Sequence, residues 1–195
     1  AAFAVRAEPQ TLRFYGYAYD LQSGKYLYTE VYRENVQNGR WISGHTSYYD
    51  AGGHRLGEKT LSFAADPYVP LYDLSLPSAG YAEGITEVGA GQVRLFKQTA
   101  EKGRQDGSVP RVAGMAADSG FHSLLYDHMA ELAAGQALKF RFAVAGQLDS
   151  YSFRARKIGD VRFEGRPAIQ LKVEPDSLLR YLVGPLLLTY DPLTK

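Results

Sequence analysis

The chain of 195 residues contains no cysteine. Disulfide bonds, thiolate nucleophiles and cysteine-based metal sites are therefore excluded. An excess of charge of one sign is also missing, because 22 lysine and arginine residues face 21 aspartate and glutamate residues, for a net charge of +1. With the basic residues scattered along the chain, no strong field is available to gather nucleic acid or an anionic membrane surface. We therefore expect no nucleic-acid partner.

Long apolar runs are absent too, and no stretch approaches the roughly 20 residues of a membrane span. We therefore expect a chain that does not span a membrane. Residues 1–7, AAFAVRA, are small and apolar before they turn polar, and Val5-x-Ala7 fits the small-residue pattern before a signal-peptidase cut. The segment is either the remnant of an export signal, which predicts a periplasmic protein, or a disordered terminus. Residues 8–195 are enough for a single domain with its own core.

Catalytic and cofactor motifs are sparse. The sequence has no phosphate-binding loop, calcium loop, zinc spacing or G-x-S-x-G turn. Of its four histidines, His122 and His128 lie six residues apart and cannot share one helix face. His45 lies between Ser43 and Ser47 on one predicted strand face, as a base beside a nucleophile would, but no acid is placed to orient it. We expect no metal, no cofactor and no enzymatic activity.

A pair of carboxylates, Glu30 and Glu34, shares one predicted strand face with several tyrosines. Glycosidases need two carboxylates at a set separation. A solvated strand face with cross-strand partners explains these two residues better, and we expect both to face solvent.

The chain is rich in long strands near its start, where eight of its 15 tyrosines fall between Tyr15 and Tyr49. Turn residues separate four runs of strand-forming residues, at 11–21, 25–36, 40–50 and 55–63. Asn38-Gly39 favours a type I′ hairpin turn, since both central residues of that turn need a positive φ. The pattern predicts an antiparallel meander with bulky side chains on both faces, and long twisted strands tend to coil around their contents.

The middle of the chain is less regular. Three prolines, Pro67, Pro70 and Pro77, argue against a central strand, so 68–76 is expected at a sheet edge. Residues 92–99 are predicted as a strand, and 100–110 as a mobile loop or hairpin tip.

One amphipathic helix is predicted over 120–134, capped by Asp118 or Ser119 and ended by Gly135. Its apolar stripe comprises Phe121, Leu124, Leu125, Met129 and Leu132.

The second half alternates apolar and polar residues. The alternation predicts strands around 139–144, 151–156 and 169–174, with turns at Gly159-Asp160 and Gly165-Arg166. A short helix is expected over 176–183 and a last strand over 186–190. That strand is either a true edge or precedes a final strand that the sequence lacks.

Four segments resemble a family of exported proteobacterial proteins of unknown function: 16–28 (GYAYDLQSGKYLY), 119–144 (SGFHSLLYDHMAELAAGQALKFRFAV), 148–159 (LDSYSFRARKIG) and 165–191, which ends in LLLTYD. The resemblance covers most of the chain, but its motifs are structural. The strand order of the family implies a fold similar to that of the periplasmic lipoprotein carriers LolA and LolB, whose open half-barrel holds acyl chains. It also implies a further strand after the position of Asp191-Pro192.

Together these patterns predict an α+β fold: a strongly curved antiparallel sheet, close to a half-barrel, with one main helix on its concave side. The expected ligand-binding residues line an apolar cavity under that sheet; they are Leu12, Phe14, Leu27, Val31, Ile42, Leu61, Phe63, Leu125 and Met129. Two other interpretations stay open. The same residues pack on the helix without a cavity, or the aromatic face binds sugar rings through Tyr15, Tyr17, Tyr19, Tyr26, Tyr28, Trp41 and Tyr49.

The predicted function is non-catalytic binding of a lipid or other acyl ligand in the periplasm, by a monomer. The alternative is an envelope scaffold module that binds a protein partner through a sheet edge, and a small hydrolase is third.

Overall fold

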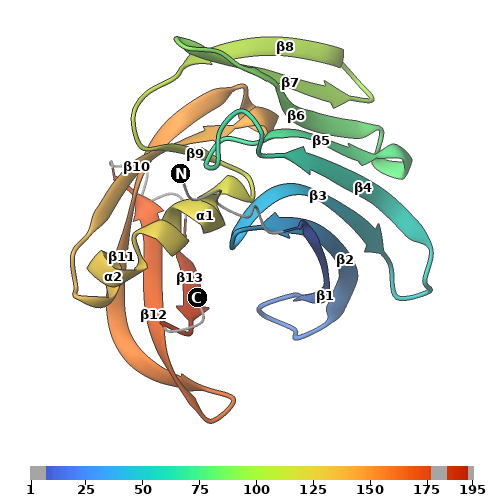
Figure 1. Cartoon of the computed structure of the whole chain (residues 1–195). Coiled ribbons are helices and arrows are strands. Elements are labelled where there is room, and N and C mark those ends of the chain that lie inside the picture. The colour runs from blue at the N-terminus through green and yellow to red at the C-terminus, as the bar shows by residue number, and fades with distance from the viewer. Residues whose placement is uncertain (1–7, 177–183, 193–195) are drawn as a thin grey trace.

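The computed structural model describes residues 8–176 and 184–192, and these form two β-sheets with short helices between them (Figure 1). The first sheet contains eight strands in sequence order: β1 (Gln10–Tyr19), β2 (Tyr26–Gln37), β3 (Arg40–Tyr49), β4 (Arg55–Ser62), β5 (Leu71–Leu76), β6 (Tyr81–Val88), β7 (Gln92–Thr99) and β8 (Gly103–Pro110). The second has the order β13 (Leu186–Tyr190), β12 (Arg166–Pro175), β11 (Asp149–Phe163), β10 (Leu138–Val144) and β9 (Met115–Ala117). The predicted α+β class with mainly antiparallel strands is confirmed, but the expectation of a single sheet is wrong.

The N-terminal meander follows the sequence pattern closely. β1 to β4 pair in order as antiparallel neighbours. Asn38 and Gly39 have φ angles of 53° and 72°, as a type I′ turn requires. The first half of this sheet was therefore set by local turn chemistry and by strand-forming residues.

Beyond β4 the sheet contains more strands than the sequence predicts. β5 pairs with both β4 and β6, so it is an interior strand and not an edge, and the three prolines lie just outside it. β6 was not expected. Its Gly84 is required because a Cβ there would lie 2.0 Å from the carbonyl oxygen of Tyr72. The segment 100–110, predicted as a mobile loop or a hairpin tip, is a hairpin turn at 100–102 followed by β8. Pairing of β8 with β7 outweighs the poor strand propensity of its two glycines.

The second sheet contains all four predicted strands of the C-terminal half, including the last one over 186–190. β11 continues through Gly159-Asp160, where the register shifts between Lys157 and Gly159, so the predicted turn is a bulge. The turn at Gly165 is confirmed, with φ of 49° at Glu164 and 79° at Gly165. β9 was not expected, and it pairs parallel to β10.

The predicted helix is broken into α1 (Gly120–Asp127) and α2 (Met129–Ala133) at His128, whose φ and ψ are −102° and 15°. Its apolar stripe packs on the second sheet, with Leu125 and Met129 beside Ile169 and Leu171. The sequence predicted this stripe on the concave side of a single curved sheet, whereas the structure divides that sheet in two and packs the stripe on the second one. The helix expected at 176–183 lies almost wholly outside the described residues, as does the segment 1–7.

Two apolar clusters hold the fold together. The first joins β4 to β8 with β9 and with Ala143 and Ala145, so it fastens the two sheets to each other. The second lies between the helices and the second sheet. α1 consequently lies between the sheets (Figure 1), and polar contacts such as the 2.7 Å ion pair between Lys59 Nζ and Asp118 Oδ1 link its start to the first sheet. Across the described ranges, no helix combines the length and apolarity that crossing a membrane would need.

Candidate functional site

The nine residues predicted to line one cavity lie in separate places. Leu61 and Phe63 belong to the first apolar cluster, and Leu125 and Met129 belong to the second. The remaining five lie on β1 to β3: Leu12, Phe14, Leu27, Val31 and Ile42.

The strand register explains why these five do not act together. Phe14 is paired with Tyr32, whereas Val31 is paired with Tyr15. Since neighbouring residues of a strand face opposite sides, Leu12 and Phe14 lie on one face of the sheet and Leu27 and Val31 on the other. Leu12 and Leu27 are each 46% exposed. The prediction that the nine side chains form a common cavity is wrong, although some of them contribute to the core.

An apolar hollow exists elsewhere, between α1 and the second sheet, with a volume of about 260 Å³. We name it the phenylalanine hollow. Its lining comprises Phe121, Phe140, Phe142, Phe153, Val173, Gly184 and Leu186. The rings contact one another: Phe121 stacks on Phe140 at 5.2 Å between centroids, and Phe142 meets Phe153 edge-on at 6.1 Å. The hollow has almost no polar group, so water inside it would lack hydrogen-bond partners.

Strand alternation creates this hollow. Phe140 and Phe142 occupy alternate positions of β10, and Phe153 lies directly opposite Phe140 on β11. The sequence pattern placed these residues on apolar strand and helix faces, but it did not indicate that Phe121 would meet them and leave space between the rings.

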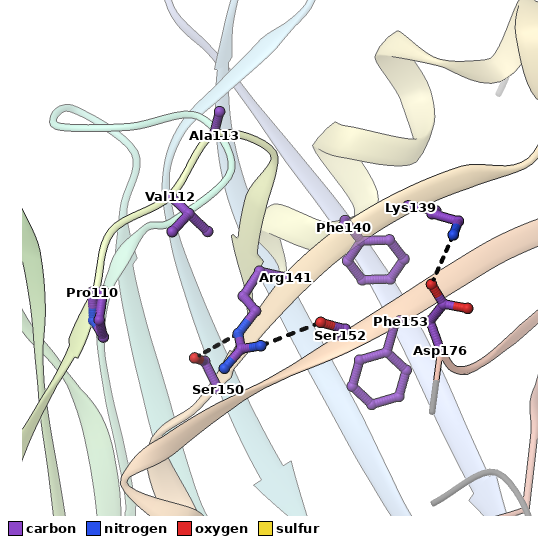
Figure 2. Close-up of a pocket in the computed structure, with 10 residues that line it drawn as sticks. All are labelled: Pro110, Val112, Ala113, Lys139, Phe140, Arg141, Ser150, Ser152, Phe153 and Asp176. Atoms are coloured by element: carbon purple, nitrogen blue, oxygen red, sulfur yellow. Dashed lines mark hydrogen bonds and ion pairs between the residues drawn. The ribbon is translucent and has the colours of Figure 1, made fainter. Parts of the chain in front are cut away.

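A second, larger space of about 470 Å³ borders the same two strands and is shown in Figure 2. We name it the arginine cleft. Its wall comprises Pro110, Val112, Ala113, Lys139, Phe140, Arg141, Ser150, Ser152, Phe153 and Asp176. Arg141 donates from Nε to Ser150 Oγ at 2.9 Å and from Nη1 to Ser152 Oγ at 3.2 Å. Lys139 Nζ lies 3.1 Å from Asp176 Oδ2. Arg141 is one of the polar residues of the alternating strand predicted around 139–144, and the alternation alone did not indicate this arrangement.

A polar cluster is buried on the inner face of the first sheet. Glu34, which the sequence placed on a solvated face, is 1% exposed. Its Oε2 atom and the hydroxyl of Thr46 have no hydrogen-bond partner among the described residues. Burial raises the pKa of Glu34 to about 7; nearby Lys59 lowers it and Asp118 raises it further. The carboxyl fits only because residue 44 is glycine, where a Cβ would lie 2.0 Å from Glu34 Oε2.

The expectation that no acid is placed to orient His45 is wrong, because His45 Nε2 lies 2.9 Å from Glu58 Oε2. Both side chains are partly exposed, and Ser43 Oγ accepts a hydrogen bond from Asn35 and not from His45. His122 stacks between Trp41 and Tyr190, and burial lowers the pKa of its imidazole. In the ranges 8–176 and 184–192, no group of three or more histidine, aspartate or glutamate residues is arranged to hold a metal ion.

Comparison of the chain with protein-family models, with curated proteins and with solved structures gave no match. The resemblance to exported proteobacterial proteins therefore stays a prediction, and function has to be inferred from the two spaces themselves.

Proposed function

We propose that the protein binds a hydrophobic, acyl-bearing molecule without chemical conversion, and that it does so in the periplasm. The observation that carries this proposal is the phenylalanine hollow, a space of about 260 Å³ walled by four aromatic rings. The two curved sheets would then serve as the open half-barrel of a LolA-like or LolB-like carrier, with its ligand held beside α1 and not under the meander.

The driving force is the removal of apolar surface from water. Each methylene group buried contributes about 0.8 kcal/mol, which corresponds to about a fourfold gain in affinity. The hollow has the volume of about nine water molecules at about 30 Å³ each, so a short acyl segment fills it. Affinity should therefore rise with chain length and then level off.

The test is a displacement titration with a fluorescent apolar probe and a series of linear alcohols from hexanol to dodecanol. Neutral alcohols are chosen so that only the apolar contact is measured. We expect affinity to increase about fourfold for each added methylene until the hollow is full. Phe142→Ala, which removes one ring from the wall of the hollow, should weaken binding about tenfold. An aromatic ring contributes more to binding than the burial of its apolar surface alone.

Phe163→Ala is the matched control, because Phe163 is 60% exposed in the hairpin between β11 and β12 and does not line the hollow. Circular dichroism verifies that each variant is folded. Absence of displacement at every chain length by folded protein would refute the proposal.

A second candidate is a scaffold role through the edge of the second sheet. Within the described ranges β13 is the outermost strand, and Leu186 and Leu187 are 51% and 53% exposed. Exposed strand edges bind extended segments of other proteins by adding a strand. A photo-crosslinking residue at position 187 should then capture one defined envelope protein, whereas the same residue at Leu27, which is 46% exposed, should not. Equal capture at both positions would argue against this role.

A further inference from the structure

We propose that the arginine cleft binds the anionic headgroup of the ligand, so that the ligand is an amphiphile ending in a carboxylate or a phosphate. This inference rests on the proposed function, because it assigns a second part of the same ligand to a second part of the protein.

The geometry of Arg141 carries the proposal. A guanidinium has five N–H donors, and Ser150 and Ser152 each accept from one of them, on Nε and on Nη1. Ser150 is only 4% exposed, so its hydrogen bond fixes the Arg141 side chain from the buried side of the cleft. Figure 2 shows this hydrogen bond. The remaining donors lie on the two outer nitrogens, which together form the fork that matches a carboxylate or phosphate.

The charge of the cleft has the sign that such a group requires. Arg141 has no carboxylate within ion-pair distance among the described residues. Lys139 adds a second cation, whose charge Asp176 balances. One positive charge is therefore left for an anion, next to hydroxyl groups that also hydrogen-bond to oxyanions.

The cleft and the phenylalanine hollow share two residues, Phe140 and Phe153. Arg141 follows Phe140 in β10, so the two spaces lie on opposite faces of the same strand pair. β9 pairs with β10 only from Arg141 to Ala143, so among the described strands the stretch from Leu138 to Phe140 has no partner on that side. A flexible acyl chain passing around this short edge joins the headgroup in the cleft to its tail in the hollow.

The experiment compares the affinities of decyl phosphate and decanoate with that of decanol, and adds inorganic phosphate alone. Wild-type protein should prefer either anion over decanol by at least tenfold, since hydrogen bonds to charged groups contribute that much. Arg141→Gln should remove this preference and leave the affinity for decanol unchanged. Arg141→Lys keeps the positive charge but loses the paired N–H donors of the guanidinium, so it should retain only part of the preference for anions. Arg13→Gln, at an exposed arginine of β1, is the matched control.

Two results would overturn the inference, and they differ in whether the proposed function fails with it. If decanol binds but Arg141→Gln keeps the full preference for anions, the headgroup is not in the cleft, whereas the hollow still binds the tail. If no alcohol binds and inorganic phosphate competes with decyl phosphate in an Arg141-dependent manner, the cleft accepts a free anion. The proposed acyl ligand then fails together with its headgroup.

Discussion

Replacement of the buried Glu34 by glutamine should change how stability depends on pH. A pKa raised from 4.5 to about 7 means that folding favours the protonated carboxyl. The stabilising effect of that proton is complete below about pH 4.5, where the unfolded chain is protonated as well. It is lost as the pH rises towards 7, because the unfolded chain releases the proton first. The expected loss in the free energy of unfolding is about 3 kcal/mol, at about 1.4 kcal/mol for each pH unit between the two pKa values.

The charged groups around Glu34 support this sign. Lys59, on β4, favours the ionised form, but its Nζ is already paired with Asp118 at 2.7 Å. Asp118, at the start of α1, opposes ionisation. The hydroxyl group of Tyr32 donates its hydrogen bond to Glu30 Oε2. It therefore does not stabilise an ionised Glu34 carboxylate. Burial is the main cause, and the neighbouring charges partly cancel each other.

The assay is urea unfolding between pH 4 and pH 8, followed by the fluorescence of Trp41, the only tryptophan of the chain. Glu34→Gln imitates the protonated side chain at every pH. The variant should match the wild type near pH 4 and be about 3 kcal/mol more stable at pH 8. Glu101→Gln, at an exposed position, is the control and should follow the wild-type curve. Parallel curves for Glu34→Gln and the wild type across this range would refute the reasoning.

Two further predictions concern stability. Leu125→Ala should cost about 2 to 5 kcal/mol, because Leu125 is fully buried, whereas Leu12→Ala should cost less than about 1 kcal/mol at a position that is 46% exposed; equal midpoints in urea would contradict the described core. Asp127 accepts hydrogen bonds from Arg40 Nη1 and from the Tyr68 hydroxyl, each at 2.6 Å. Burial raises the pKa of Asp127, but these two hydrogen bonds outweigh burial and lower it overall. Its contribution is thus complete above about pH 3.8 and decreases as the pH falls through the lowered pKa. Asp127→Asn should therefore destabilise the protein more at pH 7 than at pH 3 in thermal unfolding, and an equal loss at both values would contradict this assignment.

Features that depend on neighbours in the sequence were predictable. The Asn38-Gly39 turn, the long strands on either side of it and the stripe from Leu124 to Leu132 follow from turn chemistry and from periodicity, and the structure contains them. The α+β class follows from the same signals. These features are determined by interactions over a few residues, which a single sequence reveals.

Which alternate residues of a strand face the core was not predictable where both faces carry bulky side chains. Leu27 and Phe14 were expected on one face, yet pairing of Phe14 with Tyr32 places them on opposite faces. A shift by one residue reverses every side chain, and a strand with apolar residues on both sides does not indicate which face is buried. For the same reason, the burial of Glu34 was missed.

The sequence by itself determined the meander, the amphipathic helix and the general class. Only the tertiary structure decided that the helix packs on a second sheet, that four distant phenylalanines surround one hollow, and that Arg141 lies between two serines. Those outcomes depend on strand order and on packing between segments far apart in the chain. Their free energy comes from contacts that form only when the whole fold is assembled.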